Sequence, residues 1–367
     1  MNSSGFSARQ CAPGDLPEVI RLLDRVFRPD GTSSMGREFP VFLSPANCAG
    51  LWIVEDGPRV VSHAGVDYVT MDVEGAEVKV GMIGAVATDE PYRGKGLATV
   101  LLDAMRVDAR SRGVGFFMIS GGRGLYTRRG ARPAGSIPQF RMPFDVWRPW
   151  RHGKVTWRPA LPGDAGLIMA WYAEQNPRFS RTEAAIAQVI MANCCGNRTS
   201  IAMMNNGPVG YAVATASDGQ VHVLETGGDE AIAAALPGTC GSGFEGELVV
   251  SLTRQHPFAS AIGRLAGTAA GIERVKAAFG GTAEWVDFEA CVAQLKPYWE
   301  RHGLAAMRGA ATATGLELTD GRDTVRLEPP EMIEFFWGAP TTTAPAVPSQ
   351  WRAAVPVPLR MYGLNYI

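Results

Sequence analysis

The sequence predicts a mixed α/β protein of the α+β type, with sheets that are mostly antiparallel. Short β-rich runs bounded by turn signals alternate with longer amphipathic patterns of helical period. The clearest junction spans residues 84–102, where an apolar strand pattern ends, a Gly-rich turn follows and an amphipathic helix begins. With 367 residues, the chain is long enough for two or three domains of this class.

Composition narrows the classes of function. The 35 Lys and Arg residues nearly balance the 36 Asp and Glu residues, so the net charge of -1 argues against bulk binding to nucleic acid or to a membrane surface. The sequence contains no run of about eighteen apolar residues, so it predicts no membrane span. The first residues lack the pattern of a signal peptide, so we expect a cytoplasmic protein. The six cysteines and five histidines show no metal-ligand spacing, so we expect reduced thiols and no metal site.

Residues 1–150 are expected to form the first domain. A short strand at 6–10 precedes a helix at 15–27, which Asp15 is expected to cap. The elements expected after it are a helix at 33–43, strands at 51–55, 59–71 and 77–88, a helix at 96–112, a strand at 114–119, a helix at 125–129 and a strand at 136–144. The expected apolar side of the long helix comprises Leu97, Val100, Leu101, Ala104, Met105 and Val107.

The turn before the long helix predicts a site for a phosphate or pyrophosphate. Gly94 and Gly96 lack a Cβ atom, so the backbone there can adopt a positive φ and approach a ligand closely. The helix N-terminus adds unpaired N–H groups and about half a positive charge. Leu97 follows Gly96 where a Walker A loop needs Lys, and Thr99 stands where a Rossmann fingerprint needs its third Gly. An ordinary strand–turn–helix junction is the alternative.

The order Arg93-x-x-Gly96-x-Ala98 resembles motif A of the GNAT superfamily, the acetyl-CoA-dependent N-acetyltransferases. The order of expected elements over residues 1–150 is also similar to that of a GNAT domain. The resemblance implies that acetyl-CoA is the co-substrate, with its pantetheine along the strand end and its pyrophosphate on the turn. The residues implied to bind it are Val86, Ala87, Thr88, Arg93, Gly94, Lys95, Gly96, Leu97 and Ala98.

The stretch Leu125-Tyr126-Thr-Arg-Arg-Gly130 resembles a second GNAT motif, whose tyrosine faces the thioester sulfur. The resemblance implies that Tyr126 is the general acid that protonates the departing thiolate. A phenol with a pKa of about 10 suits that step. The alternative is a tyrosine that only packs against the long helix.

Residues 151–284 are expected to form a second, degenerate GNAT-like domain. The strand, Pro-Gly-Asp and helix pattern at 155–167 loosely repeats the pattern at 8–16. Strands are expected at 200–205, 208–216 and 220–226, followed by a helix at 227–236 in the position of the phosphate turn. That turn lacks Arg-x-x-Gly-x-Gly/Ala, and Asp229 and Glu230 would repel a pyrophosphate.

Residues 285–367 predict a small α+β region, with a helix at 287–302 interrupted by Pro297, a hairpin at 315–327 and a helix at 330–337. The three-part order resembles the "enhanced intracellular survival" acetyltransferases, in which a sterol-carrier-like domain follows two GNAT domains, although the third region is shorter here. That resemblance implies a homo-oligomer, a hexamer in that family. It also implies that the terminal carboxylate of Ile367 enters the first domain's active site as general base. The alternative is that the apolar tail at 362–367 only seals an interface.

Two classes of function follow. The first is an N-acetyltransferase that transfers an acetyl group to a primary amine of a small molecule or peptide. The second is a non-catalytic coenzyme A-binding or regulatory protein with the GNAT fold. Neither the amine nor its pocket can be identified from the sequence, and the residues expected to touch it are Phe27, Glu38 and Trp52.

Overall fold

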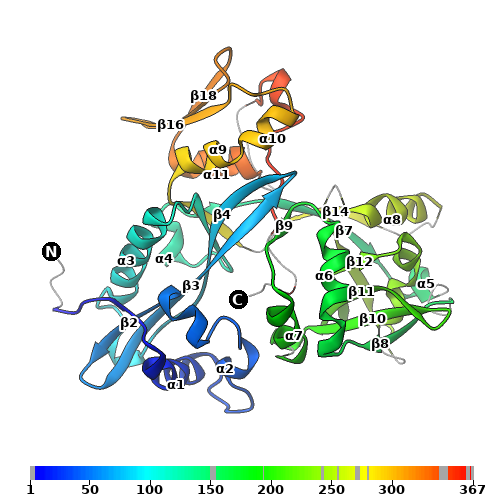
Figure 1. Cartoon of the computed structure of the whole chain (residues 1–367), viewed down its shortest axis with the longest axis horizontal. Coiled ribbons are helices and arrows are strands. Elements are labelled where there is room, and N and C mark those ends of the chain that lie inside the picture. Colours follow the sequence, from blue (N-terminus) through cyan, green and yellow to red (C-terminus); the bar gives the residue numbers. More distant parts are fainter. Residues whose placement is uncertain are drawn as a thin grey trace. The chain divides into compact units, whose positions relative to one another are not determined.

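Figure 1 shows a computed structural model of the chain. It describes residues 5–148, 154–192, 194–240, 244–253, 256–268, 273–278, 281–338, 346–360 and 364. Contacts divide the described residues into two compact units, each interrupted in sequence. Unit 1 comprises 5–134 and 281–357, and unit 2 comprises the described residues from 135 to 278 together with 358–360 and 364. The division into consecutive domains at 1–150, 151–284 and 285–367 stays a prediction.

The sheet of unit 1 is antiparallel except at one pair of strands, β4 and β5. Its strand order is β1-β2-β3-β4-β5-β15-β6. At its centre, β2 and the two long strands β3 and β4 form an antiparallel meander, and β4 also pairs with β5. The strands are β1 (Arg9–Gln10), β2 (Leu51–Asp56), β3 (Arg59–Val73), β4 (Ala76–Thr88), β5 (Phe116–Ile119), β6 (Arg132–Pro133) and β15 (Thr282–Trp285).

Four helices accompany this sheet in the described part of residues 5–134. They are α1 (Leu16–Phe27), α2 (Met35–Glu38), α3 (Leu97–Ser111) and α4 (Gly124–Thr127). Helix α3 begins after Gly96 and ends before Gly113, whose φ angles are +78° and +74°. Its buried residues are Leu97, Leu101, Leu102, Met105 and Ala109.

Three expectations for this segment are wrong in detail. The side chain of Val107 is 72% exposed, so it does not belong to the apolar face of α3. The carboxylate of Asp15 accepts a hydrogen bond from the Ala12 N–H and forms an ion pair with Arg9. It therefore makes no side-chain capping bond to α1. The helix expected at 33–43 is only the four residues of α2.

Residues 286–337 of unit 1 form a small α+β region whose hairpin matches the expected one. This region contains a sheet of strand order β16-β17-β18 together with helices. The ring of Trp337 lies 4.5 Å from that of Phe116 on β5, which joins this region to the main sheet. The elements are α9 (Phe288–Gln294), α10 (Lys296–Arg301), β16 (Arg308–Thr312), β17 (Gly315–Thr319), β18 (Thr324–Leu327) and α11 (Pro329–Trp337).

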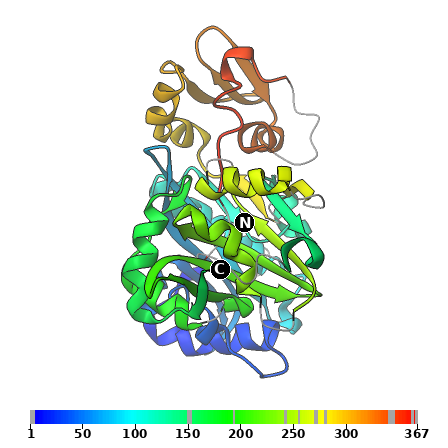
Figure 2. The same ribbon diagram turned by 90° about the vertical axis from the view of Figure 1, so that its right-hand side faces the viewer.

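The sheet of unit 2 repeats the strand order of unit 1, and its green to yellow-green strands can be followed in Figure 2. Its order is β14-β7-β13-β12-β11-β10-β8, again with one parallel pair, β12 and β13, after a three-stranded meander. Residues 136–142, expected in the first domain, form β7 of this sheet. The strands are β7 (Ser136–Met142), β8 (Thr156–Pro159), β10 (Arg198–Met204), β11 (Gly207–Ser217), β12 (Gln220–Gly228), β13 (Glu247–Ser251) and β14 (Glu273–Ala278).

The two sheets use the same position for a strand that comes from a distant part of the sequence. In unit 2, β7 lies between β13 and β14, and in unit 1, β15 lies between β5 and β6. The helix expected at 227–236 is instead a 3-10 segment, η7 (Glu230–Thr239). The remaining elements of unit 2 are α5 (Phe144–Trp147), α6 (Ala165–Ala173), β9 (Arg178–Phe179), α7 (Glu183–Ala192) and α8 (Pro257–Thr268).

Candidate active site

The parallel strands β4 and β5 separate at the end of β4 and leave its backbone open on one side. Their last paired residues are Ile83 and Ile119. Beyond that point, β4 continues to Thr88 and pairs only with β3 among the described strands. The register shifts there, and Ala85 adopts a φ of +52°, which is uncommon for a residue other than glycine. The bulge leaves residues 86–88, expected to bind pantetheine, on an edge that can accept an extended ligand.

The turn after β4 presents a row of amide groups without partners. Both Gly94 and Gly96 have positive φ, of +77° and +78°, and a Cβ atom built on either would meet no atom within 4 Å. Among the described residues outside helix α3, no backbone carbonyl accepts a hydrogen bond from the N–H groups of Gly94 to Ala98. They lie at the N-terminus of a 15-residue helix, whose dipole favours an anion. The turn therefore has the chemistry of a phosphate cradle.

Ion pairs hold the start of this turn. The carboxylate of Asp89 is mostly buried and accepts a hydrogen bond from the Glu90 N–H. It also pairs with the guanidinium of Arg59 and, at 3.5 Å, with that of Arg25. Arg93 is exposed, and its Nε donates to the Thr88 carbonyl at 3.2 Å. Asp89 thus fixes the start of the turn. The cations near the turn favour an anionic ligand.

Tyr126 lies on α4 with its side chain packed into the apolar core between the sheet and α3. It is 8% exposed. Burial raises the pKa of its phenol, and the nearby Arg123 lowers that pKa by a smaller amount. Trp52, Val86 and Leu97 belong to the same apolar cluster, Trp52 and Val86 at its partly buried edge. The structure therefore brings four of the residues expected from the sequence together.

The other two residues expected to touch the amine lie at the end of α1 and in α2. Phe27 is the half-buried last residue of α1. The carboxylate of Glu38 pairs with the guanidinium of Arg28, at 2.9 Å from its Nε, and accepts a hydrogen bond from Ser33. Arg28 and Ser33 lower the pKa of Glu38, although burial opposes them. Glu38 is therefore a charged group that is already partnered.

His63 is a candidate functional residue to which the sequence pattern gave no role. It lies fully buried on β3 opposite the bulge, with its Nδ1 2.8 Å from the Ala85 carbonyl. A carbonyl only accepts, so Nδ1 carries the proton and Nε2 is the basic nitrogen. Nε2 is buried without a hydrogen-bond partner, and burial lowers the pKa of His63 to about 4. No spacing in the sequence marks this residue, because its neighbour across the sheet depends on the bulge.

The remaining expectations concern Ile367, metal binding, membrane spans and the cysteines. Ile367, expected as general base, lies outside the described residues. Within the described ranges there is no group of three or more His, Cys, Asp or Glu side chains that could hold a metal ion. Every helix in those ranges also falls short of the length and apolar character needed to cross a membrane. Cys11, Cys48 and Cys291 are buried free thiols, and Cys194 and Cys240 are also buried.

Comparison with known proteins finds a family match for the first part of the chain. The family model described as "Acetyltransferase (GNAT) domain" matches residues 7–134. A comparison with curated proteins found no match.

Among solved structures, a GCN5-related N-acetyltransferase from Kribbella flavida has a TM-score of 0.56 at 21% identity, over 85% of this chain and 76% of that one. A GCN5-related N-acetyltransferase from Anabaena variabilis gives 0.61 at 11% identity, over 89% of both chains. Eis1 from Mycobacterium abscessus gives 0.55 at 14% identity, over 88% and 84%. Residues 7–134 therefore match a GNAT acetyltransferase domain, and the chain shares its fold with these structures.

Proposed function

We propose that this chain is an acetyl-CoA-dependent N-acetyltransferase that acts on a primary amine of a small molecule or peptide. The observation that carries the proposal is the row of unpartnered N–H groups from Gly94 to Ala98, beside the open end of β4. The family match to residues 7–134 supports acetyltransferase chemistry in general.

In this proposal the pyrophosphate of acetyl-CoA binds the turn at Arg93–Ala98, with Lys95 and Arg93 adding positive charge. The pantetheine lies along residues 86–88 and pairs with their backbone as an added strand would. That placement carries the thioester toward the bulge of β4 and toward the cluster that contains Tyr126. The unpaired edge, the anion cradle and the phenol are then used by one ligand.

The reaction balances as a direct transfer. The amine loses a proton to a base and attacks the thioester carbonyl carbon, and a backbone N–H stabilises the oxyanion that forms. Collapse breaks the C–S bond, and the thiolate takes the proton of the Tyr126 phenol. The proton that the base removed then restores the phenol. A phenol whose pKa is raised by burial stays protonated until the thiolate appears.

The proposed base is the terminal carboxylate of Ile367. A terminal carboxylate has an ordinary pKa of about 3.5, so it acts through a water or in a desolvated position that raises its pKa. Phe27, Trp52 and Glu38 are proposed to line the amine site. Because Arg28 already neutralises Glu38, we expect Glu38 to orient the amine rather than to remove its proton.

Unit 2 is proposed to be a degenerate GNAT-like domain that holds no coenzyme A. Its segment in the position of the phosphate turn begins with Asp229, whose carboxylate accepts the Ala231 N–H and so occupies the place of an anion. A cytoplasmic homo-oligomer, by analogy with the hexamers of the resembling family, completes the proposal.

A chain extended beyond Ile367 by a few Gly and Ser residues tests the role of the terminus. The added residues move the carboxylate away, so turnover should fall by about 10²-fold or more while the affinity for acetyl-CoA, measured by calorimetry, is unchanged. The matched control carries the same residues before Met1 and should keep the full rate. An extended chain with full turnover would exclude the terminal carboxylate as base. Binding of acetyl-CoA with no acetylation by any form would favour the non-catalytic alternative.

A further inference from the structure

The bulge of β4 holds a backbone conformation that is unfavourable by itself. One residue of β3, Ala64, lies opposite two residues of β4, Ala85 and Val86. Ala85 has a φ of +52°, in the left-handed region, where the Cβ atom of any residue other than glycine is crowded. Such a conformation persists only where the surrounding structure holds it. The bulge therefore depends on a contact from outside β4.

That contact comes from His63 on β3. Its Nδ1 lies 2.8 Å from the Ala85 carbonyl oxygen, and its side chain is fully buried. Because a carbonyl only accepts, Nδ1 donates the hydrogen bond. Nε2, by contrast, is buried with no hydrogen-bond partner among the described residues. An apolar side chain would fill the same space without leaving an acceptor unpaired, so what sets His63 apart from an apolar residue here is its N–H group.

The sheet of unit 2 has a bulge at the equivalent place, but without a left-handed residue in it. The parallel pairing of β12 with β13 ends at Val223, and the next residue, Leu224, is the extra one in the pairing with β11. Within β12, whose residues are all described, only Gly228 has a positive φ. A bulge after the parallel pair therefore does not by itself require a positive φ.

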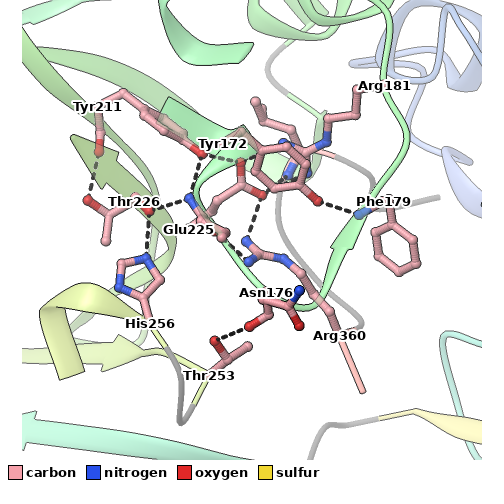
Figure 3. A network of polar contacts seen from close by, with 12 residues as sticks. Tyr172, Asn176, Phe179, Arg181, Tyr211, Glu225, Thr226, Thr253, His256 and Arg360 are labelled. Carbon is pink, nitrogen blue, oxygen red and sulfur yellow. Dashed lines mark hydrogen bonds and ion pairs between the residues drawn. The ribbon is translucent and has the colours of Figure 1, made fainter. Parts of the chain in front are cut away.

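The side chain in the position of His63 also differs between the two units. Tyr211 stands on β11 where His63 stands on β3, because each lies two residues after a carbonyl that accepts the N–H of the aspartate following the next strand. The hydroxyl of Tyr211 donates to the side chain of Glu225 at 2.8 Å (Figure 3). In unit 1 the positive φ occurs together with a bond to the bulge carbonyl, and the described residues of unit 2 have neither at this place.

The bulge decides which backbone groups the open edge of β4 presents. Along a strand, the N–H and C=O groups of successive residues point alternately to its two sides. If Ala85 left the left-handed region, the extra residue would be lost from the pairing with β3, and residues 86–88 would turn the opposite set of groups outward. A ligand that pairs with this edge therefore needs the bulge in one conformation.

We propose that His63 is a positioning residue for acetyl-CoA, because its Nδ1–H holds the bulge of β4 in the conformation in which residues 86–88 offer their free backbone groups to the pantetheine. This inference rests on the proposed function for the identity of the ligand, whereas the hydrogen bond and the bulge do not depend on it.

Three variants separate the N–H group from the rest of the side chain. His63→Leu removes the donor and keeps an apolar side chain of similar size, and His63→Asn keeps an N–H group close to the position of Nδ1. His63→Leu combined with Ala85→Gly removes the donor but lets the bulge adopt its positive φ without a Cβ atom. The matched control is His256→Leu. His256 is a buried histidine of unit 2 whose Nε2 lies 2.9 Å from the Thr226 carbonyl (Figure 3).

Two ligands report on different parts of the site. Calorimetry measures the affinity of each variant for acetyl-CoA and for 3′-phospho-ADP, the nucleotide part of the cofactor without pantetheine. Both ligands use the turn after β4, but only acetyl-CoA uses residues 86–88, so a general loss of structure weakens both and a displaced edge weakens one. Circular dichroism checks that each variant is folded. Nitrogen NMR of the parent shows which ring nitrogen of His63 carries the proton.

We expect His63→Leu to bind acetyl-CoA at least about tenfold more weakly and 3′-phospho-ADP with unchanged affinity. His63→Asn and the double variant should both recover acetyl-CoA affinity to within about threefold of the parent, and the control should match the parent with both ligands. The parent should carry the His63 proton on Nδ1.

Unchanged acetyl-CoA affinity in His63→Leu, or an equal loss for the two ligands, overturns the positioning role. A proton on Nε2 of the parent overturns it without any variant, and His63→Asn with the double variant decides the matter if His63→Leu does not fold. If the parent binds acetyl-CoA but acetylates no amine, the proposed function fails and the two affinities still decide the role of His63. A parent that binds no acetyl-CoA overturns both.

Discussion

At the scale of single residues, the proposed chemistry depends most on the buried phenol of Tyr126. Its packing against the core between the sheet and α3 excludes water from the side chain and raises its pKa. A tyrosine that only packs would serve equally well as phenylalanine. The hydroxyl is therefore the part of this residue whose removal separates a catalytic role from a structural one.

Tyr126→Phe should lower kcat by about 10²–10⁴-fold and leave the affinity for acetyl-CoA almost unchanged, because only the proton donor is lost. The matched control is Tyr68→Phe. Tyr68 packs against the same apolar cluster, and its hydroxyl donates to Asp108 of α3 at 2.8 Å. Steady-state kinetics should show a normal rate for the control. Full activity in Tyr126→Phe would make this tyrosine structural.

Gly96→Val should abolish acetyl-CoA binding while the protein stays folded. The branched side chain is strained at a φ of +78° and occupies the space into which the N–H groups point. Gly57→Val is the control, because Gly57 has a φ of +59° and similar open space in the turn between β2 and β3. Calorimetry with acetyl-CoA should show normal binding for Gly57→Val. Equal affinities in both variants would contradict the assignment of the turn.

At the scale of elements, helix α3 shows which features of a helix the sequence pattern can predict. The glycines at both ends predict its limits, since they allow the backbone to adopt a positive φ there. Its buried face is harder to predict, because Leu102 and Ala109 are buried while Val107 is exposed. A helix with apolar residues on more than one side does not reveal which of them meets the sheet until the packing partner is known.

Met105→Ala should therefore cost about 2–5 kcal/mol of unfolding free energy, because Met105 is fully buried and its loss leaves a cavity. Val107→Ala, two residues along the same helix, should change the stability by no more than about 0.5 kcal/mol, because Val107 is 72% exposed. Urea unfolding of the two variants compares them directly. Similar losses in both would mean that the face of α3 is assigned wrongly.

The bulge in β4 could not be predicted from the sequence. The strand and the turn after it follow from composition, but nothing in the residues around Ala85 announces a positive φ. The bulge results from pairing with β3, which places the Ala85 carbonyl against His63. Contacts of this kind depend on register between strands, and register is a tertiary property.

At the scale of the whole molecule, the assignment of strands to sheets was beyond the sequence. The pattern at 136–144 predicts a strand, and one is present, but β7 belongs to the sheet of unit 2. Local periodicity says that a segment is a strand without saying which sheet it joins. The buried cluster of Arg181, Glu225 and Arg360 could not be predicted for the same reason, because these residues are far apart in the sequence.

Stability of the whole molecule should fall as the pH falls from about 6.5 to 4. Burial lowers the pKa of His63, His222 and His256 to about 4. The unfolded chain, with a histidine pKa of 6.5, binds protons in this window that the folded chain does not, so acid favours unfolding. For the two most buried, His63 and His256, the loss at pH 4 is about 3 kcal/mol each.

Urea unfolding at several pH values measures this slope. His222→Gln removes one titrating group while it can keep a hydrogen bond to Ser251, so its stability should depend less steeply on pH than that of the parent. A parent whose stability does not change between pH 6.5 and 4 would show that these histidines titrate alike in the folded and unfolded chains.

We propose above all that this chain moves the acetyl group of acetyl-CoA to an amine. The most direct measurement incubates the full chain with acetyl-CoA and a panel of small-molecule and peptide amines, and follows thiol release together with the acetylated product by mass spectrometry. We expect thiol release that depends on one class of amine, that equals the amount of acetylated amine formed, and that is lost in Tyr126→Phe. Tight binding of acetyl-CoA without any acetylated amine across the panel would contradict it.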